Sequence, residues 1–276
     1  MERTLKIGGK LWQWGRRTYI MGILNITPDS FSDGGKFITI KDVLAQTKRM
    51  VEEGADIIDI GGESTRPGAE PVSHEQEVLR IIPVIKALKE QIDIPISVDT
   101  YRANTAYAAL SAGADMVNDV WGLKHDPDMA KVVADFGVPV CIMHNSASAE
   151  YDSLIEDIKA SLGKSIEIAL KSGIRNENII VDPGIGFGKT WEHNLDIMIA
   201  LEKLKSLGYP LLLGTSRKSF IGKVLGGSVD ERLEGTLATS VYGIVKGVDV
   251  LRVHDVLQNK RVAIMTDRMV RGIWTE

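Results

Sequence analysis

The sequence has little cysteine and no long hydrophobic run. Cys141 is the only cysteine among its 276 residues, so an internal disulfide is excluded. It stands inside the apolar run VPVCIM, where a thiol usually serves as a small buried hydrophobe. No apolar run approaches the roughly 20 residues that cross a bilayer, and the N-terminal segment MERTLKIGGK lacks the apolar stretch of a secretory signal. We therefore expect no membrane association and a location in the cytoplasm.

Charge of one sign is not concentrated anywhere in the chain. The formal net charge is −4, and the lysines and arginines are scattered, so the sequence offers no electrostatic footprint for nucleic acid. Local cations such as Arg66, Arg217 and Lys218 can still bind a small anion. There is no low-complexity stretch, Pro/Ser linker or charge block to mark a boundary. We expect one domain that spans residues 1–276.

Eight short apolar runs are present, and each leads into a polar or ionisable residue. A buried strand has no structural reason to end in this way, because burial of an ionisable group costs several kcal/mol unless the group is paired. Eight such endings at regular spacing indicate a ring of strand ends that face one ligand. The endings are Asn25, the segment 61–66, Asp99, Asn118, His144, Asp182, the segment 216–218, and His254 with Arg252 two residues before it.

Helical patterns alternate with these runs, and most of them end in a glycine that leads directly into the next strand. The expected helices are 42–53, 74–91, 103–112, 127–136, 151–172, 193–207, 231–246 and 255–271. This alternation predicts a (β/α)8 TIM barrel, with residues 5–14 as a small N-terminal hairpin or plug. The alternative is an open doubly wound sheet. It usually carries a Gly-rich phosphate turn after its first strand, and NITPDSFSDGG lacks that turn.

Several motifs stand at the expected carboxyl ends of the strands, where a barrel places its active site. They are MGILNITPDSFSDGG (21–35), GGESTRPGAEPV (61–72), SVDTYR (97–102), VNDVWG (117–122), DPGIGFGKT (182–190), LLLGTSRKSFIG (211–222) and RVHDV (252–256). In order and spacing, over about residues 18–271, the chain resembles the dihydropteroate synthases, a family of pterin-binding enzymes. The resemblance implies a transferase of folate biosynthesis that joins 6-hydroxymethyl-7,8-dihydropterin pyrophosphate to p-aminobenzoate, with Mg2+ as cofactor. It also implies a sulfonamide target and a homodimer that forms through helices near the carboxyl terminus.

A pterin has an amino-oxo pyrimidine edge that suits polar side chains. Asp182 can accept two charge-assisted hydrogen bonds from this edge, and Asn118 and Asp99 offer further acceptors and one amide donor. The resemblance implies that these positions hold the pterin, that Lys218 contacts it, and that Met143 packs on it. The simpler alternatives are an N-cap role for Asp182, capping of the next helix for Asp99, and satisfaction of backbone groups for Asn118.

The diphosphate leaving group requires positive charge and hydrogen-bond donors. Arg252, His254, Lys218 and Arg66 supply them, and Asn25 with Mg2+ can complete the site, because magnesium takes protein and phosphate oxygens together. The resemblance implies that Asn25 contacts the metal and that Arg252 and His254 bind the anion. His254 taken alone is equally compatible with a satisfied core histidine.

The resemblance also assigns the site of the second substrate. Phe31, Asp33, Thr65, Arg66 and Pro67 match positions that close over p-aminobenzoate and the metal, whereas Phe187 and Ser219 match positions that line its pocket. Without the resemblance, plain surface turns are the preferred explanation for the first five. The implied chemistry is an SN1-like substitution whose catalytic residues are Asp99, Asp182, Lys218, Asp33 and Arg66. Asp99 and Asp182 would stabilise a pterin cation.

One segment departs from the family pattern. After the fifth strand, many members have MHM followed by a Gly-containing loop, whereas this chain has MHNSASAEYDSL, with Asn145 in place of the second Met. His144 has no assigned role. Two other functions stay open: a pterin-dependent methyltransferase, which needs the ring pocket but no diphosphate site, and a non-catalytic pterin-binding module.

Overall fold

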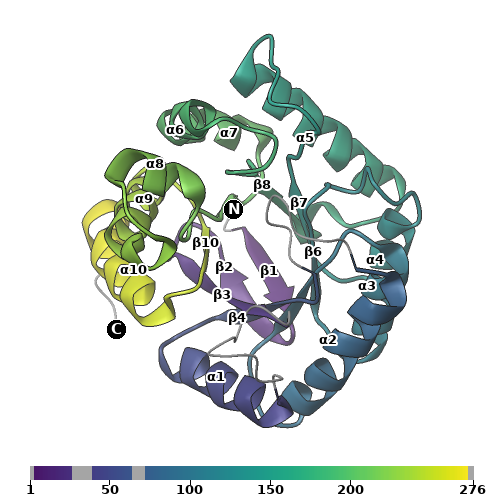
Figure 1. Ribbon diagram of the computed structural model, residues 1–276. Helices are drawn as coiled ribbons and strands as arrows, with labels where there is room; N and C mark the ends of the chain where they lie inside the picture. The colour runs from purple at the N-terminus through teal and green to yellow at the C-terminus, as the bar shows by residue number, and fades with distance from the viewer. Residues whose placement is uncertain (1–2, 27–38, 64–71, 273–276) are drawn as a thin grey trace.

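The computed structural model describes residues 3–26, 39–63 and 72–272. Eight parallel strands form a ring inside a layer of helices (Figure 1). They are β3 (Tyr19–Asn25), β4 (Ile57–Gly61), β5 (Ile96–Asp99), β6 (Met116–Asp119), β7 (Val140–Met143), β8 (Ile179–Asp182), β9 (Leu212–Leu213) and β10 (Val250–Val253). Their order is β8-β7-β6-β5-β4-β3-β10-β9, and a parallel bridge between Val181 and Leu211 brings β8 beside β9. The predicted barrel is confirmed, and the open doubly wound sheet is wrong.

Helices surround the ring in chain order, and Figure 1 shows them as the outer layer. They are α1 (Ile40–Glu52), α2 (His74–Lys89), α3 (Ala103–Ser111), α4 (Met129–Phe136), α5 (Leu154–Lys171), α6 (Trp191–Ile199), α7 (Leu201–Leu204), α8 (Ser219–Leu225), α9 (Leu233–Val245) and α10 (Val256–Arg271). None of the helices in the described part of the chain has the length and apolar character of a membrane span.

Two helical segments differ from the sequence prediction. The range 193–207 is broken into α6 and α7, because the backbone leaves helical geometry at Ala200 (φ −96°, ψ 7°). The helix α8 was not expected. It has seven residues and ends at Gly226, whose φ of 77° no helix accommodates, so it is too short to show a periodic apolar pattern. The expected passage from helix through glycine to strand is seen at Gly137, which ends α4 in the left-handed conformation (φ 66°).

The barrel interior is apolar at the amino ends of the strands. Leu5, Ile7 and Trp12 come from an antiparallel hairpin, β1 (Thr4–Ile7) and β2 (Lys10–Gln13), and pack against inward-facing strand residues. Those strand residues are Tyr19, Met21, Ile57, Met116, Cys141, Ile180, Leu212 and Val250. The hairpin therefore plugs this end, as the sequence predicts. Cys141 is fully buried, which raises the pKa of its thiol well above the ordinary value and makes it unsuited to act as a nucleophile.

Polar residues replace this apolar layer further along the same strands. Side chains of a strand alternate between its two faces, so residues two apart share a face. Two positions after Ile57, Met116, Ile180 and Val250 come Asp59, Asn118, Asp182 and Arg252. The same interior that is packed with hydrocarbon at one end therefore presents ionisable groups toward the carboxyl ends.

Candidate active site

An arginine joins two carboxylates across the barrel mouth. Arg252 of β10 donates from Nε to Asp59 Oδ2 at 2.6 Å and from Nη2 to Asp99 Oδ2 at 2.6 Å. Asn118 Nδ2 donates to the same Asp59 oxygen at 3.0 Å. The four residues come from β10, β4, β5 and β6, so the ring of strands assembles a polar cluster from distant parts of the sequence.

Burial and charge act in opposite directions on this cluster. Burial alone would lower the pKa of Arg252, but Asp59 and Asp99 outweigh it and raise that pKa above its ordinary value. Burial raises the pKa of Asp99 to about 7. Arg252 acts to lower this pKa, and the negative charge of Asp59 adds to the rise. The mouth thus holds a permanent cation beside a carboxylate that titrates near neutral pH.

Three buried oxygens of this region have no hydrogen-bond partner among the described residues. They are Asp59 Oδ1, Asp99 Oδ1 and Ser97 Oγ. Buried polar atoms in native proteins are almost always paired, because desolvation of an unpaired one costs about 1–3 kcal/mol. All three belong to inward-facing positions of β4 and β5, so the interior of the barrel mouth is built for a ligand that supplies donors.

A second pair of charges lies on β8 and after β9. Asp182 is buried, and its Oδ1 accepts from the backbone N–H of Gly184 at 2.7 Å. Lys218 donates from Nζ to the carbonyl oxygen of Ile185, and this ammonium lies 4.5 Å from the centroid of the Phe187 ring. Burial lowers the pKa of Lys218 to about 8, with the negative charge of Asp182 opposing the shift. Burial also raises the pKa of Asp182, whereas Lys218 lowers it.

The capping alternatives are not what the structure shows. Thr190 caps α6, eight positions after Asp182. The N-cap of α3 is Arg102, so Asp99 does not cap that helix. The side chain of Asn118 pairs with a carboxylate rather than with backbone groups. All three side chains are therefore available to the interior of the mouth.

After β9 and β10, two pairs of side chains join the neighbouring segments: His254 with Ser216, and Arg217 with Asp255. His254 Nδ1 lies 3.0 Å from the hydroxyl of Ser216, which also accepts from the His254 backbone N–H. Arg217 has a left-handed backbone (φ 56°) and pairs with Asp255 at 2.6 Å. Arg217 is thereby fixed to the start of α10, so it does not share the role of Lys218.

The remaining predicted site residues fall at the same end of the barrel or outside the described ranges. Asn25 ends β3, and a Cβ on Gly61 would lie 3.5 Å from Asn25 Oδ1 and 3.8 Å from Asp99 Oδ2, so these two side chains flank the end of β4. Met143 is buried at the end of β7, and Ser219 is exposed at the first position of α8. Phe31, Asp33, Thr65, Arg66 and Pro67 lie outside the described residues.

Among the described residues, no group of three or more His, Cys, Asp or Glu side chains can hold a metal ion. Asn25 is the one predicted metal ligand that these residues contain. A site with a single amide oxygen fits magnesium, which commonly keeps several waters and takes substrate phosphate oxygens, and it does not fit zinc.

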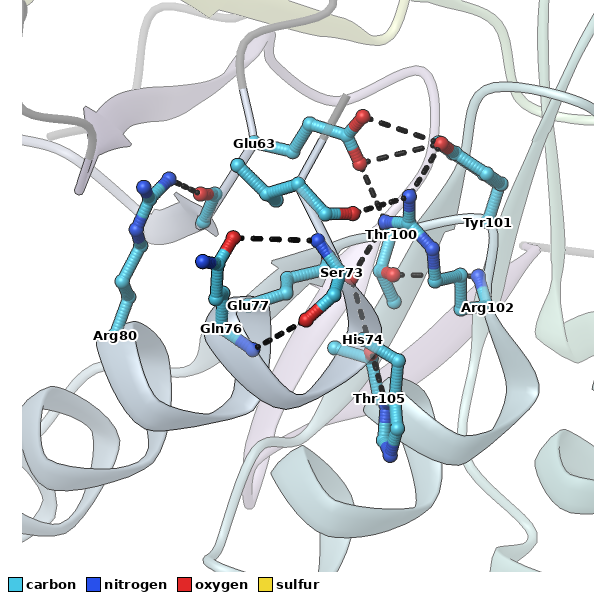
Figure 2. Close-up of polar contacts among 12 residues, drawn as sticks. Glu63, Ser73, His74, Gln76, Glu77, Arg80, Thr100, Tyr101, Arg102 and Thr105 are labelled. Atoms are coloured by element: carbon cyan, nitrogen blue, oxygen red, sulfur yellow. Dashed lines mark hydrogen bonds and ion pairs between the residues drawn. The ribbon is translucent and has the colours of Figure 1, made fainter. Parts of the chain in front are cut away.

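A further polar cluster joins the ends of β4 and β5 and was not predicted. Figure 2 shows Arg102 between two carboxylates: its Nη1 donates to Glu63 and, at 2.8 Å, to Glu77, and its Nη2 donates to the Val72 carbonyl oxygen at 3.0 Å. Tyr101 donates to Glu63 at 3.2 Å. Arg102 thus holds the two residues that precede and follow the segment 64–71.

Two other polar residues of the mouth were also missed. Asp59 lies within the apolar run ADIIDI, and the signal was its charge at the centre of a buried strand. Lys189 ends the GIGFGK segment and contacts His144 Nδ1 at 2.9 Å. No sequence pattern reveals that this lysine is drawn inward.

Known proteins share both the sequence and the geometry. The model of the family described as pterin binding enzyme matches residues 21–254. The dihydropteroate synthase of Clostridium beijerinckii is 59% identical over 97% of this chain and all of its own length, and that of Bacillus subtilis is 53% identical over 92% and 89%. The Clostridium difficile dihydropteroate synthase, solved in the presence of pteroic acid, superposes with a TM-score of 0.92 at 55% identity and covers 94% of this chain and 99% of its own. The Yersinia pestis enzyme, solved with a sulfonamide drug complex, gives 0.92 at 38% identity, with 98% and 100% covered.

Proposed function

The chain belongs to the pterin binding enzyme family, and from the dihydropteroate synthases among its relatives we propose that its barrel mouth joins 6-hydroxymethyl-7,8-dihydropterin pyrophosphate to p-aminobenzoate. The products are 7,8-dihydropteroate and pyrophosphate, which makes the protein a transferase of the folate pathway. The observation that carries this proposal is the cluster of Asp59, Asp99 and Arg252, whose two unpartnered carboxylate oxygens face the same interior as Asp182 and Lys218.

The pterin occupies the polar interior. Asp182 receives hydrogen bonds from the amino-oxo edge of the ring, and Asn118 and Asp99 bind the rest of its polar groups. Met143 packs on the ring and Lys218 contacts it. The unpartnered oxygens support this placement, because a ring with several N–H donors satisfies buried acceptors that water alone satisfies poorly.

The diphosphate lies toward Arg252, His254 and Arg66. Ser216 holds His254 through Nδ1, which orients the ring for a contact with an anion. Mg2+ would be held by Asn25 together with phosphate oxygens, and when bound it neutralises charge on the leaving group.

The substitution proceeds in two stages without a covalent enzyme intermediate. The bond between the pterin methylene carbon and the diphosphate oxygen breaks first, and its electron pair leaves with pyrophosphate. Asp99 and Asp182 stabilise the cation that remains on the pterin, and the buried thiol of Cys141 takes no part. The p-aminobenzoate amine then forms the C–N bond and releases a proton.

The second substrate binds between Lys218, Phe187 and Ser219, with Thr65, Arg66 and Asp33 from segments outside the described ranges. The ammonium above the Phe187 ring supports this pocket, because it offers charge for a carboxylate next to an apolar surface for a benzene ring. Sulfonamides, which resemble p-aminobenzoate, would compete for this pocket.

A homodimer and a cytoplasmic location complete the proposal. Exposed apolar side chains gather on α9 and α10, which pack together, and a second copy of the chain would cover them. They are Tyr242, Val245, Leu257, Ile264, Met265, Met269 and Val270. Sedimentation of the protein and of an Ile264→Lys variant tests the dimer, since the charge should shift the chain to the monomer.

Release of pyrophosphate tests the reaction itself. With both substrates and Mg2+, the protein should release pyrophosphate, and it should release little when p-aminobenzoate or Mg2+ is omitted. Asp182→Asn should lower kcat/KM by roughly 10- to 100-fold, since a charge-assisted hydrogen bond contributes about 1.5–3 kcal/mol. A methyltransferase or a binding module would bind the pterin and release no pyrophosphate.

A further inference from the structure

Three close acceptors surround the ammonium of Lys189, on the loop between β8 and α6, and a fourth, the carbonyl oxygen of His144, lies farther away at 3.5 Å. Its Nζ lies 2.8 Å from the carbonyl oxygens of Gly184 and of Phe187 and 2.9 Å from Nδ1 of His144. An ammonium has three N–H donors and no lone pair, so it can only donate to Nδ1 of His144. Nδ1 of His144 must therefore accept, which places the imidazole proton on Nε2 and keeps the ring neutral.

The electrostatic surroundings agree with this tautomer. Burial, and then the positive charge of Lys189, lower the pKa of His144 to about 3. Burial lowers the pKa of Lys189 to about 7, with Asp182 opposing the shift and with Lys218 and Lys124 adding to it. His144 thus stays neutral at any pH near 7, whereas Lys189 loses its proton within the physiological range.

The loop lies directly on the chain that follows β7. Gly184 and Gly188 have φ angles of 70° and 56°, and a Cβ on either would overlap a carbonyl oxygen, that of His144 or that of Ser146. Tyr151 donates from its hydroxyl to the Gly188 carbonyl oxygen at 2.6 Å. The loop therefore depends on the segment 144–146, where this sequence departs from the family pattern.

The same loop also contacts Lys218, the lysine that we assign to both substrates. Ile185 supplies the carbonyl oxygen that accepts from Lys218, and Phe187 supplies the ring beneath that ammonium. Both residues lie between Gly184 and Lys189, within the turn that the Lys189 ammonium closes.

We propose that Lys189 is a positioning residue for Lys218 and Phe187, and that neutral His144 is the acceptor that orients it. This inference rests on the proposed function for its effect on turnover, and on geometry alone for the protonation of His144. A neutral amine has two N–H donors and no charge, so deprotonation of Lys189 weakens its hold on the loop carbonyl oxygens, and Nδ1 of His144 keeps a hydrogen bond only if its proton moves from Nε2 to Nδ1.

Lys189→Met tests the positioning role. We expect kcat/KM for p-aminobenzoate to fall by about 10- to 100-fold, because a small misplacement of a substrate-positioning group has an effect of that size. The control is Lys205→Met, which removes a lysine that donates to a loop carbonyl, that of Gly247 at 3.0 Å, in the connection between α9 and β10. The Lys205 variant should keep wild-type kinetics. Equal kinetics for Lys189→Met and the wild type would overturn the proposal.

Two measurements separate positioning from general loss of stability. The KM of the wild type for p-aminobenzoate should rise as the pH passes about 7, and Lys189→Arg, which stays charged, should lose that rise.

Nitrogen NMR of the wild type at pH 6 should show His144 protonated on Nε2 and not on Nδ1. A proton on Nδ1 would overturn the proposal even if the Lys189 variants do not fold. The NMR result does not depend on catalysis, so failure of the proposed function would appear separately, as a wild type that releases no pyrophosphate.

Discussion

Asp59 Oδ2 lies 2.6 Å from Arg252 Nε, although 193 positions separate the two residues in the sequence. Asp59 is fully buried and the Arg252 side chain is only 18% exposed, so the pair is shielded from water. The pair connects the carboxylates that we assign to the pterin site with Arg252, the cation that we assign to the diphosphate. The pairing of β10 with β3, and of β3 with β4, brings the two residues together.

Asp59→Asn should weaken the fold as well as the reaction. The free energy of unfolding is expected to fall by about 3 kcal/mol, because removal of one charge of a buried pair leaves the other poorly compensated. Urea unfolding measures this change. Asp93→Asn is the matched control, since Asp93 pairs with Lys10 at the surface and is 97% exposed, and this variant should unfold like the wild type. Equal loss in both variants would contradict the importance of the buried pair.

Asp99 should make stability depend on pH near neutrality. Its pKa in the folded chain is about 7, above the ordinary value of 3.8, so the folded state binds the proton more tightly than the unfolded state. The stabilising contribution is therefore complete below about pH 4 and is lost as the pH rises to about 7, with a slope of at most about 1.4 kcal/mol per pH unit. Urea midpoints measured across this range should fall more steeply for the wild type than for Asp99→Asn. Parallel curves would show that Asp99 does not titrate there.

Gly184→Ala should be far more damaging than Gly137→Ala. Both glycines have left-handed backbones, with φ angles of 70° and 66°. A Cβ at 137 meets nothing within 4 Å, whereas one at 184 overlaps the His144 carbonyl oxygen. Gly137→Ala should cost about 1 kcal/mol for its backbone conformation, and Gly184→Ala should cost at least about 2 kcal/mol more through overpacking. Thermal and urea unfolding of the two variants distinguish the steric effect from the conformational one.

Arg102→Met should raise the KM for p-aminobenzoate more than the KM for the pterin substrate. Arg102 pairs with Glu63 and Glu77, whose side chains are 10% and 1% exposed, and its loss leaves both carboxylates without their cation. Glu63 also directly precedes the segment that carries Thr65 and Arg66. Steady-state kinetics with each substrate varied in turn measures the split. Lys131→Met, at an exposed helical ion pair, should change neither KM.

Much of the architecture could be read from the sequence because its signals are local. A glycine after a helical pattern and an apolar run after that glycine are both visible in a short window, and eight apolar runs that alternate with helical patterns predict a ring. Asp99, Asn118, Asp182, Lys218 and Arg252 were identified because each follows or ends such a run, and the barrel brings them to one end. Their individual roles in catalysis remain predictions.

The residues that were missed depend on contacts between distant segments. Asp59 stands inside a strand rather than at its end, so only the closed ring reveals the arginine that compensates it. Lys189 looks like a solvated lysine beside a glycine-rich loop, and its position depends on two glycines that approach the backbone after β7. The helix α8 escaped notice because seven residues are too few for a periodic signal.

The hairpin of β1 and β2 fills the amino side of the ring with Leu5, Ile7 and Trp12, and Trp12 stacks on Tyr19 at 4.1 Å. The hairpin therefore closes the amino end of the barrel, so a molecule that enters at the carboxyl ends of the strands also leaves there. The reactant seated deepest has to arrive before its partner and cannot depart past it. With the substrates placed as we propose, the pterin reactant should therefore bind first and p-aminobenzoate second.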